Sequence, residues 1–226
     1  IIGSYVVVKR IVFISGGIAH TSFGGIGIAT YLGKDPIYGA TVFSLLSSII
    51  MGIMRRFSRE KEDTLIGILW AMGMAIGVIF IHLTKGYHAD LMSYLFGNIL
   101  MVPTDALCFM LFLDIIILTT VILLYRPLLA IVFDEEYAES QGLPVTMLYI
   151  VLLSLIALTV VTVIRVVGII LTISLLTTPA AISEKFTKKL NTMMLLAFAV
   201  GFVLTTIGIV VSYYLNIATG ATIIIV

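Results

Sequence analysis

The sequence predicts an all-α protein that crosses a membrane several times. Its 226 residues are 61% hydrophobic and only 11% charged, and the mean hydropathy is +1.21. A soluble domain carries about 25% charged residues, so this lack of charge excludes an ordinary soluble fold. Several uncharged runs are long enough to cross a bilayer as helices. We therefore expect a polytopic transmembrane helical bundle.

The first complete predicted span covers residues 11–32. These 22 residues carry no formal charge, and a helix of that length rises about 33 Å, enough to cross the hydrocarbon core. Charged or proline-containing breaks then separate the later spans: Gly33-Lys34-Asp35-Pro36, RRFSREKED (55–63), Arg126-Pro127, Arg165 and EKFTKKL (184–190). Between these breaks the sequence predicts spans over residues 37–54, 65–83, 106–125, 146–164, 166–183 and 192–215.

Three apolar segments are too short to cross. Residues 91–102 lie inside KGYHADLMSYLFGNILMVPTD, and we expect them to form an external re-entrant or interfacial helix. The two ends, IIGSYVVVKR and ATIIIV, give incomplete first and last spans. We expect about eight to nine spans in the full chain, and a single transmembrane domain over residues 1–226.

The distribution of lysine and arginine predicts the orientation in the membrane. Simple alternation of the spans, with 91–102 not crossing, leaves Lys34, Lys85 and Arg165 on one side. The other side then holds Lys9, Arg10, Arg55, Arg56, Arg59, Lys61, Arg126, Lys185, Lys188 and Lys189. This richer side is assigned to the cytoplasm, and the acidic segment 134–144 lies there too.

His20 lies near the middle of a predicted span, in the small-residue segment SGGIAHTSFGGIG (15–27). The small residues favour close packing of helices in lipid. One interpretation is a structural histidine, hydrogen-bonded to a neighbouring helix or to a backbone carbonyl. The other is a pathway residue, because ionisable groups inside a membrane usually face a cavity or the bundle interior. Imidazole is also a common ligand of divalent transition metals.

Other ionisable residues lie near or within the spans. Asp114 in FLDIIILTT is the carboxylate that lies deep in a span; we expect it to pair with a polar group of another helix or to accept from hydroxyls. His82, with His88 and Asp90, lies on the predicted external side. These three residues are either ordinary interfacial groups or a weak site for a cation or an external partner.

The segment DEEYAESQGLP (134–144) predicts a short helix at the cytoplasmic side. Asp134, Glu135 and Glu136 stand where a helix N-terminus favours negative charge. Gly142 and Pro144 are typical of the residues that end a helix. The segment is either a capped surface helix or a docking helix whose exposed face fits a groove on a cytoplasmic partner.

Several classes of function are excluded by missing patterns. The sequence has no G-x-x-x-x-G-K-[ST] loop and no H-E-x-x-H motif. It also lacks the paired acids or Ser/His pair that an intramembrane enzyme needs. Basic patches interleaved with aromatic residues, typical of nucleic-acid binding, are absent. The single Cys108 allows no intrachain disulfide, and we expect it to be inert packing.

Seven blocks in a fixed order carry a resemblance. They are VVVKR (6–10), GGIAHTSFGGIG (16–27), SYLFGNIL (93–100), PTDAL (103–107), DEEYAESQGLPV (134–145), RVVGIILTISLLTTPAAIS (165–183) and SYYLNIATGATIIIV (212–226). Together they resemble, almost end to end, the membrane permease subunits of bacterial and archaeal ABC importers for zinc, manganese and iron. That family often has an aspartate four residues before the histidine, where this chain has Gly16. A metal-contact role therefore carries over to His20 alone, and the choice among the three metals stays open.

The resemblance implies a transport subunit in the cell membrane rather than an enzyme. Two copies would form the translocation path for a divalent metal, an external metal-binding protein would deliver it, and a separate cytoplasmic ATPase would hydrolyse ATP. The chain itself would hold no cofactor. The resemblance assigns coupling to the ATPase to Asp134, Glu135, Glu136, Ala138, Glu139 and Gly142.

Three alternatives differ from this reading. Permeases for iron chelates and cobalamin are similar in plan but longer. An ATP-independent secondary transporter or channel would normally show several acidic groups within its spans, or inverted repeats. A membrane enzyme lacks the residues named above.

Overall fold

The computed structural model describes residues 1–57, 62–84, 104–215, 217 and 219–226, and all regular secondary structure in these residues is helical. Within these residues, six helices are long and apolar enough to cross a membrane, or seven if one bent pair counts as a span. This confirms the all-helical membrane fold. The eight to nine spans are not confirmed. The expected re-entrant segment 91–102 lies outside the described residues, as do His88 and Asp90.

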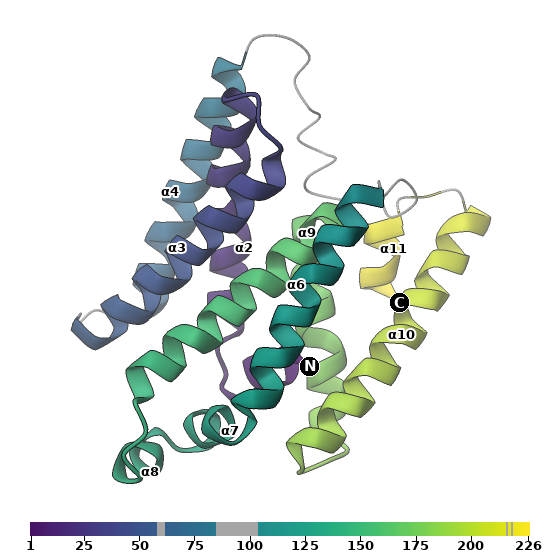
Figure 1. Ribbon diagram of the computed structural model, residues 1–226. Helices are drawn as coiled ribbons and strands as arrows, with labels where there is room; N and C mark the ends of the chain where they lie inside the picture. Colours follow the sequence, from purple (N-terminus) through teal and green to yellow (C-terminus); the bar gives the residue numbers. More distant parts are fainter. Residues whose placement is uncertain (58–61, 85–103, 216, 218) are drawn as a thin grey trace. The chain divides into compact units, whose positions relative to one another are not determined.

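The helix boundaries agree closely with the predicted spans. In chain order, the helices are α1 Ile2–Val8, α2 Val12–Tyr31, α3 Pro36–Phe57, α4 Glu62–Leu83, α6 Thr104–Leu123, α7 Tyr125–Phe133, α8 Glu135–Ser140, α9 Val145–Glu184, α10 Leu190–Leu215 and α11 Thr219–Ile225 (Figure 1).

Helix α7 follows a span that the sequence predicts. The span predicted over 106–125, ending at Arg126-Pro127, is α6, which ends at Leu123, and the chain then bends by 75° and continues as α7. Pro127 is the third residue of α7. In the first turn of a helix the backbone N–H has no intrahelical acceptor, so a proline there breaks no hydrogen bond.

Helix α9 contains two candidate spans, Val145–Ile164 and Val166–Glu184, as the sequence predicts. The two spans part at Arg165, as expected, and the non-helical backbone lies three residues later at Gly168, with φ 77° and ψ 172°. A Cβ atom clashes with the backbone in this conformation, so only glycine adopts it readily. The backbone kink inside α9 is therefore set by a glycine.

The backbone contacts divide the chain into two compact units. One unit holds α2, α3, α4, α7 and α8, with most of α6 and residues 145–162 of α9. The other holds α1, α10 and α11, with residues 163–184 of α9 and residues 104–107 of α6. The single domain over 1–226 stays a prediction.

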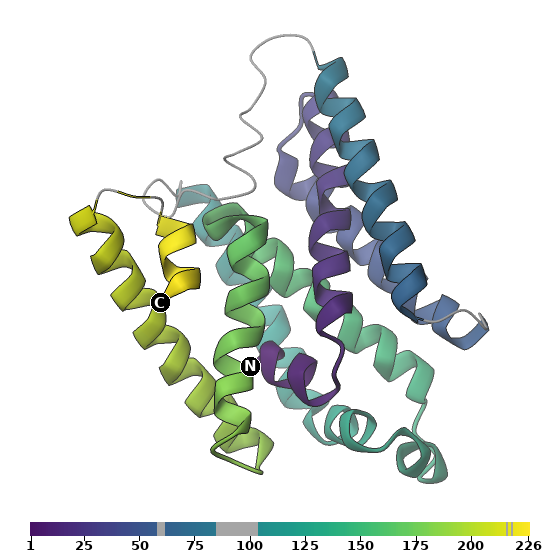
Figure 2. The same ribbon diagram turned by 180° about the vertical axis from the view of Figure 1, so that it is seen from behind.

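Helix α2 is the central helix of the first unit, and α3 and α4 lie beside it (Figures 1 and 2). Its apolar window is 78% buried, against 28% for α4. A Cβ atom on Gly25 would clash with the backbone carbonyl of Gly39 on α3, and one on Gly27 would clash with the backbone of Gly77 on α4. The three backbones therefore meet without side chains between them, as the small residues predict.

The second unit packs around the C-terminal part of α9. Gly3 of α1 lies against the carbonyl of Leu176 on α9, and Gly208 of α10 lies against α11. A buried cluster joins α9 to α11 and consists of Val167, Leu171 and Ile223. Glycine contacts thus bring α10 and α1 close to their neighbours in this unit too.

Replacing Gly25 by alanine should lower the melting temperature of the purified protein in detergent by on the order of 5 °C, because overpacking strains a core. Gly67 of α4 is a matched control, since nothing lies within 4 Å of its added Cβ. Gly67→Ala should leave the melting temperature unchanged or raise it slightly, because alanine favours helix. Size-exclusion chromatography after heating measures both variants. Equal melting temperatures would contradict the close approach of α2 and α3.

Candidate functional site

His20 is held on α2 by a flat stack with an aromatic ring of α4. The imidazole and the indole of Trp70 have ring centroids 4.0 Å apart and an interplanar angle of 10°. The side chain is half-buried, and its Nδ1 atom is buried and makes no hydrogen bond within the described residues. The stack fixes the plane of the imidazole, so a metal ion would have to approach a ring nitrogen from the edge.

Glycines let α4 come close enough to α2 to form this stack. Gly17, one turn before His20, lies against Ile66 of α4. Gly73, almost one turn after Trp70, lies against the backbone of Thr21 on α2. Larger residues at these positions would push the helices apart and separate the two rings. The small-residue segment 15–27 thus helps to position the histidine, because it lets α4 approach α2.

His20 has few protein groups to share a metal ion with. Among the described residues no cluster of three or more His, Cys, Asp and Glu side chains could hold a metal. Position 16, one turn away on the same helix, is a buried glycine. The described residues therefore offer an ion at His20 no cluster of three such side chains.

Asp114 lies in the middle of α6 and is exposed. No hydrogen bond or ion pair of Asp114 is found among the described residues, so its expected polar partner stays a prediction. His82, in the last turn of α4, is also exposed. Neither residue lies in the His20 stack.

Helix α8 has the caps that the sequence predicts. The side chain of Asp134 accepts a hydrogen bond from the backbone N–H of Tyr137, with an oxygen–nitrogen distance of 3.0 Å. Gly142 follows the helix with φ 76°, a conformation that favours glycine. Ala138 is fully buried. Three of the six residues assigned to coupling therefore cap or anchor the helix. Ala138 is buried, while Asp134 and Gly142 are exposed.

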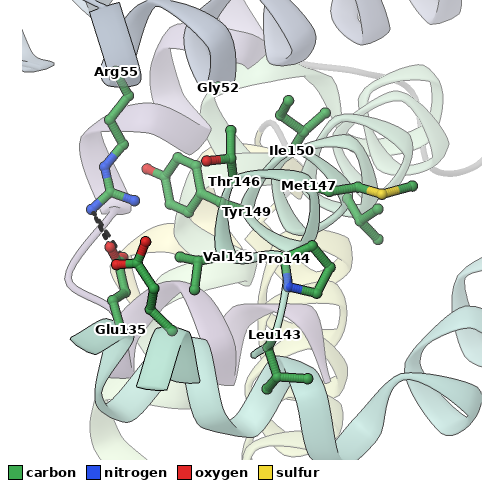
Figure 3. A pocket seen from close by; sticks show the side chains of 12 residues that line it. Gly52, Arg55, Glu135, Leu143, Pro144, Val145, Thr146, Met147, Tyr149 and Ile150 are labelled. Carbon is green, nitrogen blue, oxygen red and sulfur yellow. Dashed lines mark hydrogen bonds and ion pairs between the residues drawn. The ribbon is translucent and has the colours of Figure 1, made fainter. Parts of the chain in front are cut away.

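Glu135 is tied to a neighbouring membrane helix. Arg55, in the last turn of α3, forms an ion pair with it at 2.9 Å from Nη2 to Oε1 and 3.1 Å from Nη2 to Oε2. The guanidinium carbon also lies 4.0 Å above the ring centroid of Tyr149, a buried residue of α9. Figure 3 shows Arg55 pointing at both groups. An exposed ion pair contributes about 0–1 kcal/mol and a partly desolvated cation–π contact about as much again.

The exposed side chains of α8 are those left after these internal contacts. Glu136, Tyr137 and Glu139 are exposed, and Tyr137 is 57% accessible. The surface that α8 offers to another molecule is therefore acidic with one aromatic ring. Of the predicted coupling residues, Asp134, Glu136 and Glu139 carry exposed carboxylates, and Glu139 also lines the cavity beside α8.

The sequence did not single out Trp70 or Tyr149, and it used Arg55 only to assign orientation. Trp70 is the single tryptophan in the sequence and stands among small and apolar residues, LWAMG. Its rarity was a usable signal, but its partner was not, because His20 and Trp70 are fifty positions apart. The Arg55–Glu135 pair agrees with the orientation analysis, which placed both residues on the same side.

The model of the ABC 3 transport family matches residues 1–226, the whole chain. Over 226 residues the chain is 49% identical to an uncharacterized membrane protein of Synechocystis sp., covering 100% of this chain and 80% of that protein. It is 33% identical over 226 residues to the manganese transport system membrane protein MntC of Halalkalibacterium halodurans, covering 100% and 77%. The solved structure of PsaBC from Streptococcus pneumoniae in complex with Fab matches with a TM-score of 0.87 and 32% identity, over 99% of this chain and 80% of that chain.

These similarities extend along the whole chain and agree with its long apolar helices. The chain is therefore a membrane protein that belongs to the ABC 3 transport family.

Proposed function

We propose that the chain is the membrane permease subunit of an ABC importer for a divalent transition metal, driven by a separate cytoplasmic ATPase. The observation that carries the proposal is α8, a short capped helix with an acidic exposed face that follows a bent pair of membrane helices. Such a helix can be gripped by another protein and moved as a rigid body. The chain has no phosphate-binding loop of its own in its sequence.

Manganese is the ion that we propose first. Relatives that match nearly the full chain are named for manganese transport or import. A single imidazole with open coordination positions suits a site that must release its ion quickly. Zinc and iron are the other candidates, because imidazole binds both.

Asp114 supports a second copy of the chain as partner. An ionisable side chain that faces lipid in mid-membrane is costly, and Asp114 is exposed on α6 in the single chain. Another chain that covers this face of α6 would remove that cost. We therefore propose a homodimer, with an external metal-binding protein delivering the ion.

The fluorescence of Trp70 should report metal binding at His20, because Trp70 is the single tryptophan in the sequence. Adding Mn²⁺ or Co²⁺ to the purified chain should quench the emission, since both ions have unpaired electrons and would lie beside the indole. His20→Ala should abolish the quench, and His82→Ala, a change at an exposed histidine of α4, should keep it. An equal quench in His20→Ala would exclude His20 as the binding residue.

His20→Ala should reduce metal uptake by about tenfold in vesicles that hold the whole complex, the scale seen when a metal site loses a supporting group. The amount of ATPase that copurifies should not change, because His20 lies in mid-span and away from α8 in sequence. Uptake is measured with Mn²⁺, Zn²⁺ and Fe²⁺ separately, and this panel also identifies the ion. Unchanged uptake of all three ions would remove His20 from the pathway.

Replacing Glu136 and Glu139 together by lysine should release the ATPase, because reversing the charge of a docking face creates repulsion against a complementary partner. We expect about tenfold less ATPase in pull-downs with the tagged permease. Glu184→Lys is the matched control, an exposed glutamate at the end of α9 on the same predicted side of the membrane. A normal complex with normal metal-stimulated hydrolysis would refute the docking assignment.

The same vesicles separate the alternatives. Metal transport by this chain without any ATPase would overturn the ABC importer and favour a secondary transporter. Uptake of an iron chelate or cobalamin in place of the free ions would assign the chain to the other permease class.

A further inference from the structure

We propose that Arg55 is a positioning residue that ties α8 to α3 and carries the displacement of α8 into the helices that hold His20. The inference rests on the proposed function, since it assumes that an ATPase moves α8. It adds a specific route for that movement, through the side of α8 that faces the membrane helices.

The side chain of Arg55 connects α3 to both α8 and α9. Arg55 projects from the last turn of α3 to Glu135, the first residue of α8, and lies over the ring of Tyr149 on α9 (Figure 3). The side chains of Arg55 and Glu135 are 30% and 28% exposed, so water screens the pair less than it would at the surface. The planar guanidinium can stack on a ring and bind a carboxylate at the same time, which a lysine cannot do.

The ion pair lies beside an open space next to α8. The helix has only six residues. A cavity of about 790 Å³ opens next to it, lined by residues of α3, α8, the following loop and the start of α9. The ion pair crosses from α8 to α3 beside this open space. A push on α8 would reach α3 directly through this pair.

Tight packing continues the route from α3 toward His20. Gly52, nearly one turn before Arg55, packs directly on Ile150 of α9. Met51 of α3 lies beside Gly17 of α2, where an alanine Cβ would be in ordinary van der Waals contact with it, and Gly17 stands three residues before His20. Because close-packed helices do not deform continuously, a displacement at this end of α3 is passed on to its neighbours. The contacts form one contiguous path between α8 and α2, and the transport measurements below test whether it carries coupling.

A purely structural role for Arg55 predicts a different outcome from a positioning role. If the Arg55–Glu135 ion pair only stabilised the fold, its loss would lower the amount of complex and leave the number of metal ions transported per ATP unchanged. If the Arg55–Glu135 ion pair transmits movement, the ATPase would still bind and hydrolyse ATP, because the exposed carboxylates of Glu136 and Glu139 are unchanged, while metal transport would fall. The ratio of ions transported to ATP hydrolysed separates the two roles.

The test uses the whole complex in vesicles, with Arg55→Gln, Glu135→Gln and the charge-swapped pair Arg55→Glu with Glu135→Arg. Each single variant should lower the ratio of ions to ATP by about tenfold, within the usual range of coupling between two sites. The charge-swapped pair should recover a large part of the loss. Arg126→Gln is the matched control, an exposed arginine on the neighbouring α7, and should keep the wild-type ratio. Single variants with a wild-type ratio would overturn the proposal.

A second measurement does not depend on the ATPase. A protease that cuts after glutamate acts on the purified chain, where Glu136 and Glu139 are exposed. Arg55→Gln should speed cleavage within α8 about tenfold, because local opening exposes the helix to the protease, and the charge-swapped pair should slow it again. Equal cleavage rates in all variants would show that the Arg55–Glu135 ion pair does not hold α8 in place. If wild-type permease binds no ATPase, the proposed function fails, and the cleavage rates still decide whether Arg55 holds α8.

Discussion

The close approach of helix backbones through glycine is the constraint on which the rest of this structure depends. In lipid there is no hydrophobic drive to bring apolar helices together, so association relies on packing at short range. Gly25 against Gly39 and Gly27 against Gly77 let α3 and α4 pack directly on α2. The same closeness brings Trp70 onto His20. The packing of the bundle and the geometry of its candidate site therefore have one physical cause.

The other end of the first unit is organised by charge and not by glycine. Asp134 caps α8, Gly142 follows it in a left-handed conformation, and Arg55 pairs with Glu135. These internal uses divide a run of four acidic residues into two classes. Asp134 and Glu135 hold the helix in place, while Glu136 and Glu139 are exposed, and we propose that these two meet a partner.

Helices that depend on a local pattern could be predicted from the sequence. Long uncharged runs predicted α2, α3, α4 and α10, and the acidic cap with its glycine predicted α8. Local signals placed the ends of the spans but not the backbone geometry there. Pro127 stands in the first turn of α7, where it is tolerated, so the chain is helical again after the bend. The spans part at Arg165, but charge does not set backbone conformation, and Gly168 holds the positive φ.

By itself, the sequence determined that the chain is helical, lies in a membrane, and carries one histidine among small residues in mid-span. These properties follow from composition and from patterns within a few helical turns. Only the tertiary structure decided which residues meet: Trp70 on His20, and Arg55 between Glu135 and Tyr149. Such pairs lie 50 to more than 90 positions apart in the chain. Their contact depends on how helices pack against one another, which no local pattern encodes.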